Sequence, residues 1–134
     1  MRTSLILALL GLAVAFLGAD GVVAAQGLSM QSSSAAGVTV KATPRALPGK
    51  AWEFAIVLES HSQELNDDLL NTASLRAGKK AVAAAGWQGD PPGGHHRKGV
   101  LRFSATEAGV PEIELRITRV GEPRPHSFRW QLVE

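Results

Sequence analysis

Hydrophobic and polar residues alternate along three stretches of the chain. The clearest is WEFAIVLES, residues 52–60, and PEIELRITRV (111–120) and HSFRWQLVE (126–134) repeat the pattern. One side of the first stretch carries four large apolar residues: Trp52, Phe54, Ile56 and Leu58. Successive side chains of a strand point to opposite faces, so this alternation predicts half-buried strands with one face on a core. A helix would turn the charged residues of these stretches into the core.

Weaker strand patterns occupy most of the remaining chain. They cover residues 38–43, 73–77, 80–87 and 99–105. Residues 63–73 are the one helix-like segment, with leucines that suit one or two short turns. About seven short strands separated by turns predict an all-β fold, an antiparallel immunoglobulin-like β-sandwich. A small β-barrel is the alternative.

The beginning of the chain has a different pattern. Arg2 precedes an apolar run over residues 5–17, and Val23-Ala24-Ala25 follows as a small-residue cleavage pattern. This layout predicts a secretory signal peptide over residues 1–25. The apolar run is shorter than the roughly 20 residues that span a bilayer, although an uncleaved anchor is the alternative. We therefore expect no stable membrane span after cleavage, and a periplasmic or secreted protein.

Two further boundaries follow from the same pass along the chain. Residues 26–36 are small and polar without periodicity, which predicts a flexible leader. Residues 37–134 would form the β-sandwich domain. The chain has no cysteine, so this domain would be held by its apolar core without disulfides.

Charge and motifs exclude several classes of function. The chain has 14 basic and 12 acidic residues, and no face gathers the basic ones, so a nucleic-acid partner is not expected. The segment DPPGG lacks the spacing of a phosphate loop, and no serine stands in a nucleophile-elbow pattern. We therefore expect a protein that is not an enzyme.

The histidines are the most informative polar residues. If each strand runs antiparallel to the one before it, the loops after the second, fourth and sixth of seven strands lie at one end of the sandwich. These loops hold every histidine of the chain: His61, His95, His96 and His126. Asp67 and Asp68 lie in the same loops, whereas the loops of the opposite end hold lysines and one glutamate. The sequence thus predicts one histidine-rich end.

This end admits three interpretations. Imidazoles with carboxylates suit Zn²⁺ or Cu²⁺, and we expect such a site to use six residues: His61, His95, His96, His126, Asp67 and Asp68. His95 and His96 would share an ion only in a tight bend, which Gly93-Gly94 could provide. Alternatively, GGHHRKG is a polar connection between strands, or it contacts a partner protein with Trp87 and Arg97 as anchors.

Two longer motifs carry a resemblance. The stretches WEFAIVLESHSQELNDDLL and WQGDPPGGHHRKGVLRF resemble a group of small, uncharacterised exported bacterial proteins. That group has the pattern W-x-F-x-V-x-L-x-x-H-S-x-x-L-x-D-D-L and, later, W-x-G-x-x-x-G-G-H-H-R-x-G-x-L-x-F. The resemblance covers roughly residues 52–103 and implies a discrete secreted domain without a particular activity. A looser resemblance is to periplasmic immunoglobulin-like copper carriers, which have a histidine at the mature N-terminus where this chain has Gln26.

Together these observations predict an exported, non-enzymatic binding or accessory domain. Its most concrete ligand would be a transition metal held at the histidine-rich end. The alternative is a protein–protein interaction module of the cell envelope that uses the same loops.

Overall fold

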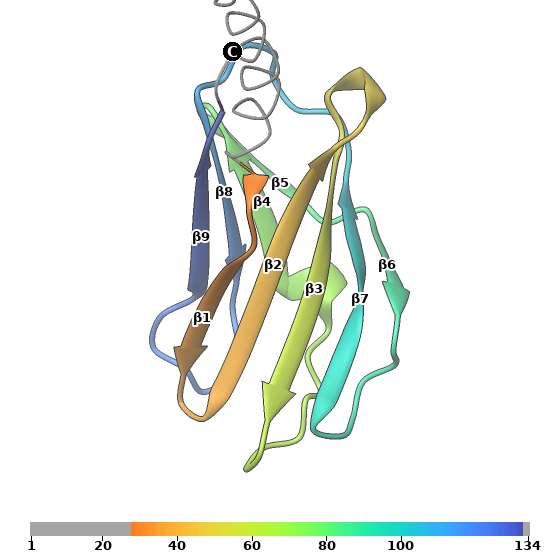
Figure 1. Ribbon diagram of the computed structural model, residues 1–134, viewed down its shortest axis with the longest axis vertical. Coiled ribbons are helices and arrows are strands. Elements are labelled where there is room, and N and C mark those ends of the chain that lie inside the picture. Colours follow the sequence, from red (N-terminus) through yellow and green to blue (C-terminus); the bar gives the residue numbers. More distant parts are fainter. Residues whose placement is uncertain (1–27, 133–134) are drawn as a thin grey trace, which may run out of the picture.

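Two antiparallel β-sheets packed face to face form the protein in the computed structural model, which describes residues 28–132 (Figure 1). The strands follow in the order β1 (Gln31–Ala35), β2 (Val38–Ala46), β3 (Trp52–Ser60), β4 (Ala73–Ala77), β5 (Lys80–Ala83), β6 (Gly86–Gly89), β7 (His96–Phe103), β8 (Glu112–Ile117) and β9 (His126–Gln131). One sheet has the order β1-β2-β3-β7-β6 and the other the order β5-β4-β8-β9. The predicted all-β sandwich is confirmed.

Two short helical turns accompany the strands. A 3-10 turn, η3 (Pro48–Lys50), connects β2 to β3, and a helix of one turn, α2 (Leu69–Thr72), precedes β4. The second lies inside the segment that was predicted to be helix-like. In the described part of the chain, no helix is long and apolar enough to cross a membrane. The predicted signal peptide lies outside the described residues.

The core forms where the alternating stretches predicted it. Trp52, Phe54, Ile56 and Leu58 of β3 are all buried. Phe54 connects the two sheets, because its ring centroid lies 5.6 Å from that of Phe103 in β7 and 5.6 Å from that of Trp130 in β9. Burial of such aromatic side chains dominates the stability of a domain that has no disulfide.

One predicted strand is divided between the two sheets. The segment predicted as a single strand over residues 80–87 forms β5 beside β4 and then β6 beside β7. Ala84 and Ala85 carry the chain from one sheet to the other, and the chain continues in the same direction (Figure 1). Because no reversal occurs there, residues 38–132 reverse direction as many times as predicted. The crossing also closes one side of the sandwich.

The other side is closed by β1, and here the sequence prediction was wrong. Residues 31–35, predicted to belong to a flexible leader, form a strand that pairs with β2. The Gln31 side chain then occupies the free edge of β9: its Nε2 donates to Arg129 O at 2.6 Å, and its Oε1 accepts from Arg129 N at 3.2 Å. Trp130 Nε1 donates to Ser29 O at 2.7 Å. This polar segment without apolar alternation pairs with β2, and its Gln31 side chain takes the place of a strand partner at the edge of β9.

Candidate functional site

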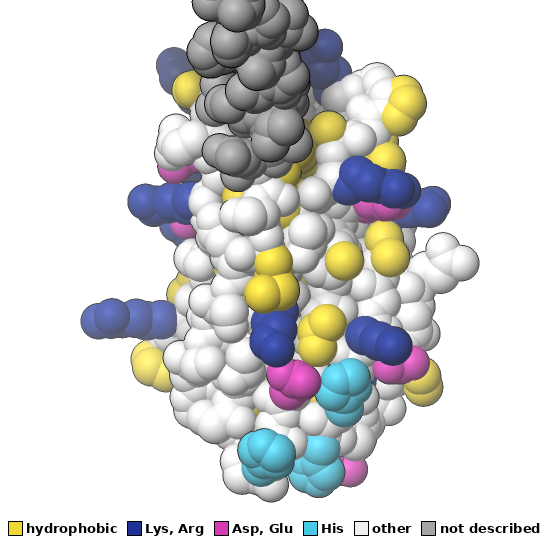
Figure 2. All heavy atoms as spheres, viewed as in Figure 1, with side chains coloured by type: hydrophobic (Ala, Val, Ile, Leu, Met, Phe, Trp, Pro, Cys, Tyr) yellow, Lys and Arg dark blue, Asp and Glu magenta, His cyan; other side chains and the backbone are white. Residues whose placement is uncertain are grey.

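Four connections meet at one end of the sandwich, which we call the histidine end. They are the β1–β2 turn (36–37), the β3–β4 loop (61–68), the β6–β7 loop (90–95) and the β8–β9 loop (118–125). All four histidines lie in or beside these connections, as predicted. Figure 2 shows the exposed histidine side chains gathered at this lower end of the molecule.

The histidines share this end but make separate contacts there. His126 is only 2% exposed, whereas His61, His95 and His96 are exposed. His95 Nδ1 lies 2.9 Å from the backbone oxygen of Gln63, and His96 Nε2 lies 3.5 Å from Glu59 Oε2. Within residues 28–132, no three histidine, aspartate or glutamate side chains are placed so that they could hold a metal ion. The six predicted metal ligands are thus not gathered around one point, and metal binding stays a prediction.

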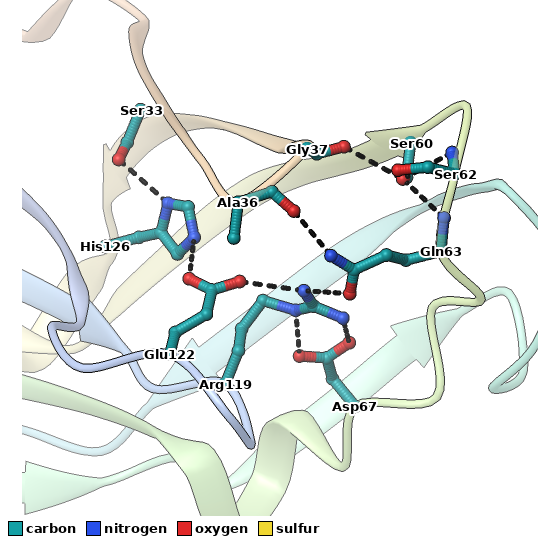
Figure 3. A network of polar contacts seen from close by, with 10 residues as sticks. All are labelled: Ser33, Ala36, Gly37, Ser60, Ser62, Gln63, Asp67, Arg119, Glu122 and His126. Carbon is teal, nitrogen blue, oxygen red and sulfur yellow. Dashed lines mark hydrogen bonds and ion pairs between the residues drawn. The ribbon is translucent and has the colours of Figure 1, made fainter.

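Two of those six residues belong instead to a buried polar network around Arg119 (Figure 3). The Arg119 guanidinium contacts both oxygens of Asp67, with Nε at 2.8 Å and Nη2 at 3.2 Å, and its Nη1 lies 2.9 Å from Glu122 Oε2. The other oxygen of Glu122 is 3.0 Å from His126 Nε2, and His126 Nδ1 is 2.8 Å from Ser33 Oγ. One continuous chain of contacts therefore joins the β3–β4 loop, the β8–β9 loop, β9 and β1.

A second branch of the network reaches the β1–β2 turn. Gln63 Oε1 accepts from Arg119 Nη1 at 3.4 Å, and Gln63 Nε2 donates to the backbone oxygen of Ala36. Ser60 Oγ donates to Gly37 O at 2.8 Å and accepts from the backbone N–H of Gln63 at 2.9 Å. These short side chains attach the turn to the β3–β4 loop.

Electrostatics keep Arg119 charged in this environment. Burial alone would lower the pKa of its guanidinium, but hydrogen bonds and charge attraction from Asp67 and Glu122 outweigh burial, and the pKa of Arg119 is raised above its ordinary value. The guanidinium therefore stays positively charged at every ordinary pH. When Glu122 is ionised, its oxygen accepts a hydrogen bond from His126 Nε2, and His126 Nδ1 shares the second hydrogen bond with the Ser33 hydroxyl, which can donate or accept. Every member of the network then has a partner, as buried polar groups require.

Arg97 joins two of the same loops from within the molecule. Its side chain, 2% exposed, donates from Nη1 to Leu65 O at 3.2 Å and to Asp67 O at 2.9 Å, and from Nη2 to Asp90 O at 3.3 Å. Arg97, predicted to be an anchor for a partner, is instead buried and bonded within the domain. The hydrogen bonds of its guanidinium fix the β3–β4 loop to the β6–β7 loop.

Trp87 is partly buried and lies beneath Arg97. The Arg97 guanidinium carbon lies 5.5 Å from the centroid of the indole, and Trp87 Nε1 donates to Asp90 O at 3.0 Å. A Cβ atom at Gly99 would come within 2.7 Å of the Trp87 ring, so only glycine admits the ring there. The tryptophan, arginine and later glycine of the WQGDPPGGHHRKG segment are therefore explained by packing, and its two exposed histidines are not.

A cavity of about 390 Å³ opens at the histidine end beside the network. The β3–β4 loop, α2 and the β8–β9 loop surround it, and its lining includes Glu64, Asp67, Asp68, Arg119 and Val120. Of these, only Asp67 and Asp68 were among the predicted site residues.

Sequence reasoning missed the centre of this network, although a signal was present. Arg119 follows Ile113, Leu115 and Ile117 at the inward-facing parity of its stretch. Arg97 has the same relation to Leu101 and Phe103. A charged residue at an inward position of an alternating strand is expensive unless it is paired, and so indicates a buried polar site.

Comparisons with known proteins do not extend this description, because no family model, no curated protein and no solved structure matches the chain.

Proposed function

We propose that this is an exported, non-enzymatic binding domain with an immunoglobulin-like sandwich that contacts a partner protein of the cell envelope through its histidine end. The observation that carries the proposal is that buried and half-buried side chains join all four connections at this end to one another. Loops fixed before binding lose little conformational entropy when a partner docks, which is how preorganised recognition surfaces gain affinity.

The placement of the ionisable groups supports a binding role over a catalytic one. Arg119, Asp67 and His126 are enclosed and bonded to other protein groups, so their charges and protons serve the loops. His61 and His95 on the fixed loops, and His96 at the start of β7, are exposed, where a partner can reach them. Binding residues are commonly carried on loops that a rigid β-sandwich positions.

Export rests on the sequence. The signal-peptide pattern over residues 1–25 and the absence of cysteine are compatible with a periplasmic or secreted domain. A partner in the same compartment would be a protein of the cell envelope.

Site-specific photo-crosslinking tests the proposal. A photoreactive benzoylphenylalanine would be placed at His61 or His95, and at Lys50 or Lys79 of the opposite end as matched controls; all four side chains are exposed. We expect the histidine-end positions to cross-link one defined protein in the native organism and the control positions not to do so. Equal labelling from both ends, or none from the histidine end, would refute a binding role for these loops.

A transition metal is the second candidate, favoured by one observation. His96 Nε2 and Glu59 Oε2 lie 3.5 Å apart and both side chains are partly exposed. Two ligands of one tetrahedral Zn²⁺ ion, with bonds of about 2.0–2.1 Å, lie at roughly this separation. His61 and His95 on the adjoining loops would have to reorient to complete the set.

Calorimetric titration with Zn²⁺ and Cu²⁺ separates this candidate from the first. Binding through imidazole should be detectable at about pH 7.5 and weaken at about pH 5.5, because protonated histidine is not a ligand. A His96→Ala variant should lose the heat, and Lys98→Ala, two positions along the same strand face, should retain it. An absence of binding by the wild type at about pH 7.5 removes the metal candidate and leaves the partner proposal intact.

A further inference from the structure

One apolar side chain at the histidine end has no role in the fold. Val120 is 99% exposed and occupies the first central position of a turn that Arg119 O and Glu122 N close with a 3.1 Å hydrogen bond. Gly121, at the second central position, has a φ of 86°, which this kind of turn requires and glycine readily adopts. The turn thus presents a valine directly to solvent.

This turn is unusually well fixed for an exposed loop tip. The side chains of its two flanking residues, Arg119 and Glu122, are 7% and 5% exposed and pair with each other at 2.9 Å. Arg119 is held in turn by Asp67. Val120 therefore occupies a defined position although it makes almost no buried contact itself. An apolar residue in that position suits contact with another molecule.

The cavity beside Val120 gives the surface a charge. Three carboxylates line it, those of Glu64, Asp67 and Asp68, against one guanidinium, that of Arg119, which gives a formal charge of 1 − 3 = −2. The whole chain carries +2, so this surface differs in sign from the average of the molecule. Both oxygens of Asp67 are engaged by Arg119, which leaves the exposed side chains of Glu64 and Asp68 as the charges that a ligand would meet.

Polar uncharged groups complete the lining. Asn66, Thr72 and Thr118 also line the cavity, and their side chains carry amide and hydroxyl oxygens. Carbonyl, hydroxyl and carboxylate oxygens are the acceptors that an ammonium or guanidinium group needs when it leaves water. The volume of about 390 Å³ is sufficient for the end of one long basic side chain.

We propose that the cavity and the Val120 turn form one contact site for a partner segment in which a lysine or arginine stands next to an apolar residue. The cation enters the cavity between Glu64 and Asp68, and the apolar residue packs against Val120. This inference rests on the proposed binding function and specifies the chemistry of the partner.

Nuclear magnetic resonance titration with a small probe tests it. The probe is acetyl-leucyl-arginine amide, and its matched control is acetyl-leucyl-citrulline amide, which has the same shape without the charge. We expect saturable shifts of the Thr72, Thr118 and Val120 amides with the arginine probe, and at least fivefold weaker binding of the citrulline compound. No saturation up to about 20 mM, or equal binding of the two compounds, would overturn the proposal.

Two variants and one control locate the interaction. Glu64→Gln should weaken arginine-probe binding about fivefold, and Val120→Ser about threefold, because they remove a charge and an apolar contact respectively. Glu107→Gln, on a loop of the opposite end, should leave it unchanged. All three should unfold at the wild-type temperature, since each side chain is exposed. Unchanged binding by the first two variants would contradict the assigned site.

The outcomes also separate this inference from the proposed function. If the photo-crosslinks form at the histidine end but the arginine probe does not bind, the domain binds a partner and the cavity chemistry is wrong. If the probe binds and no cross-link forms, the partner proposal fails and the cavity chemistry stands. Amide shifts at this site that depend on protein concentration without any probe would mean that a second copy occupies it, and would overturn the proposal.

Discussion

The two ends of the sandwich are built on different principles. At the histidine end, side chains distant in the sequence are joined through buried charges, as with Arg119 and Asp67. At the opposite end, the connections 47–51, 78–79 and 104–111 are short or exposed. Glycines with positive φ form turns at both ends, such as Gly49 here and Gly121 at the histidine end. The loops of the opposite end are joined by Thr106, which bonds to Lys50 O.

The two ends also differ in the number of buried polar residues, which are costly to remove from water. Ser60, Arg97, Arg119 and His126, four of the six buried polar residues in the described part of the chain, lie at the histidine end. The other two, Glu53 and Glu114, lie on strands and pair with exposed arginines. Turns fixed by local conformation would be sufficient to connect strands. Buried ion pairs add little net stability over apolar packing but can specify one arrangement of the loops.

Removing Arg119 is expected to have the largest effect on stability, because Arg119 lies at the centre of the buried network of the histidine end. Arg119→Ala leaves Asp67 and Glu122 as buried carboxylates without their cation, which should lower the free energy of unfolding by about 3–5 kcal/mol. Urea denaturation measures this. Lys79→Ala at the opposite end is the control and should change stability by less than about 0.5 kcal/mol. Equal losses would show that the two ends do not differ.

Arg97 tests whether loop fixation can be reduced locally. Arg97→Met preserves much of the side-chain length but withdraws three hydrogen bonds from backbone oxygens, with an expected loss of about 2–4 kcal/mol. Hydrogen exchange should accelerate most at Leu65 N and Gly93 N, which bond between the two loops that Arg97 joins. Exchange at Thr106 N, at the opposite end, should be unaffected. A uniform acceleration throughout the domain would instead indicate global destabilisation.

A pair of glycine substitutions distinguishes close packing from turn conformation. Gly99→Ala would force a methyl group against the Trp87 ring, with an expected loss of about 1–3 kcal/mol and a change in tryptophan fluorescence. Gly49→Ala meets no atom within 4 Å, so only the strain of its φ of 75° remains, about 1 kcal/mol. Thermal unfolding with fluorescence detection compares them. A fluorescence change in Gly49→Ala of the same size would contradict the assignment.

The smallest effects on stability are expected at the exposed histidines. They are compared with the buried His126 of the same end. The triple variant His61→Ala, His95→Ala, His96→Ala should change stability by about 0.5 kcal/mol or less. His126→Ala, which removes contacts to Ser33 and Glu122, should cost about 1–3 kcal/mol. Chemical denaturation of the two variants measures the difference. A triple variant as unstable as His126→Ala would mean that the exposed histidines also hold the fold.

The sequence predicted the core and the shared end of the histidines because both depend on parity. Alternation placed Phe54 and Trp130 inside, and the direction of successive strands placed His61 and His126 at one end. The same parity places Arg119 inward, so its burial could have been predicted.

The partners of those buried residues could not be predicted from the sequence. Asp67 and Gln63 lie in a loop without periodicity, and their contacts depend on how residues 61–68 fold back over the sandwich. The strand β1 escaped prediction because hydrogen bonds from Gln31 and Ser33 order it, and a run of serines looks the same whether or not such acceptors are nearby.

The closure of the sandwich by β1 also bears on how the chain folds. Gln31 and Arg129 stand 98 positions apart, so the contact between them joins nearly the first described segment to nearly the last. Contacts of such high sequence separation form slowly, because a long loop must close before they contribute. β1 is an edge strand of its sheet, and until β9 packs beside it nothing covers that edge; uncovered strand edges can pair with other molecules. Because β1 is rich in serine, its edge has few apolar groups that could promote aggregation before β9 packs beside it.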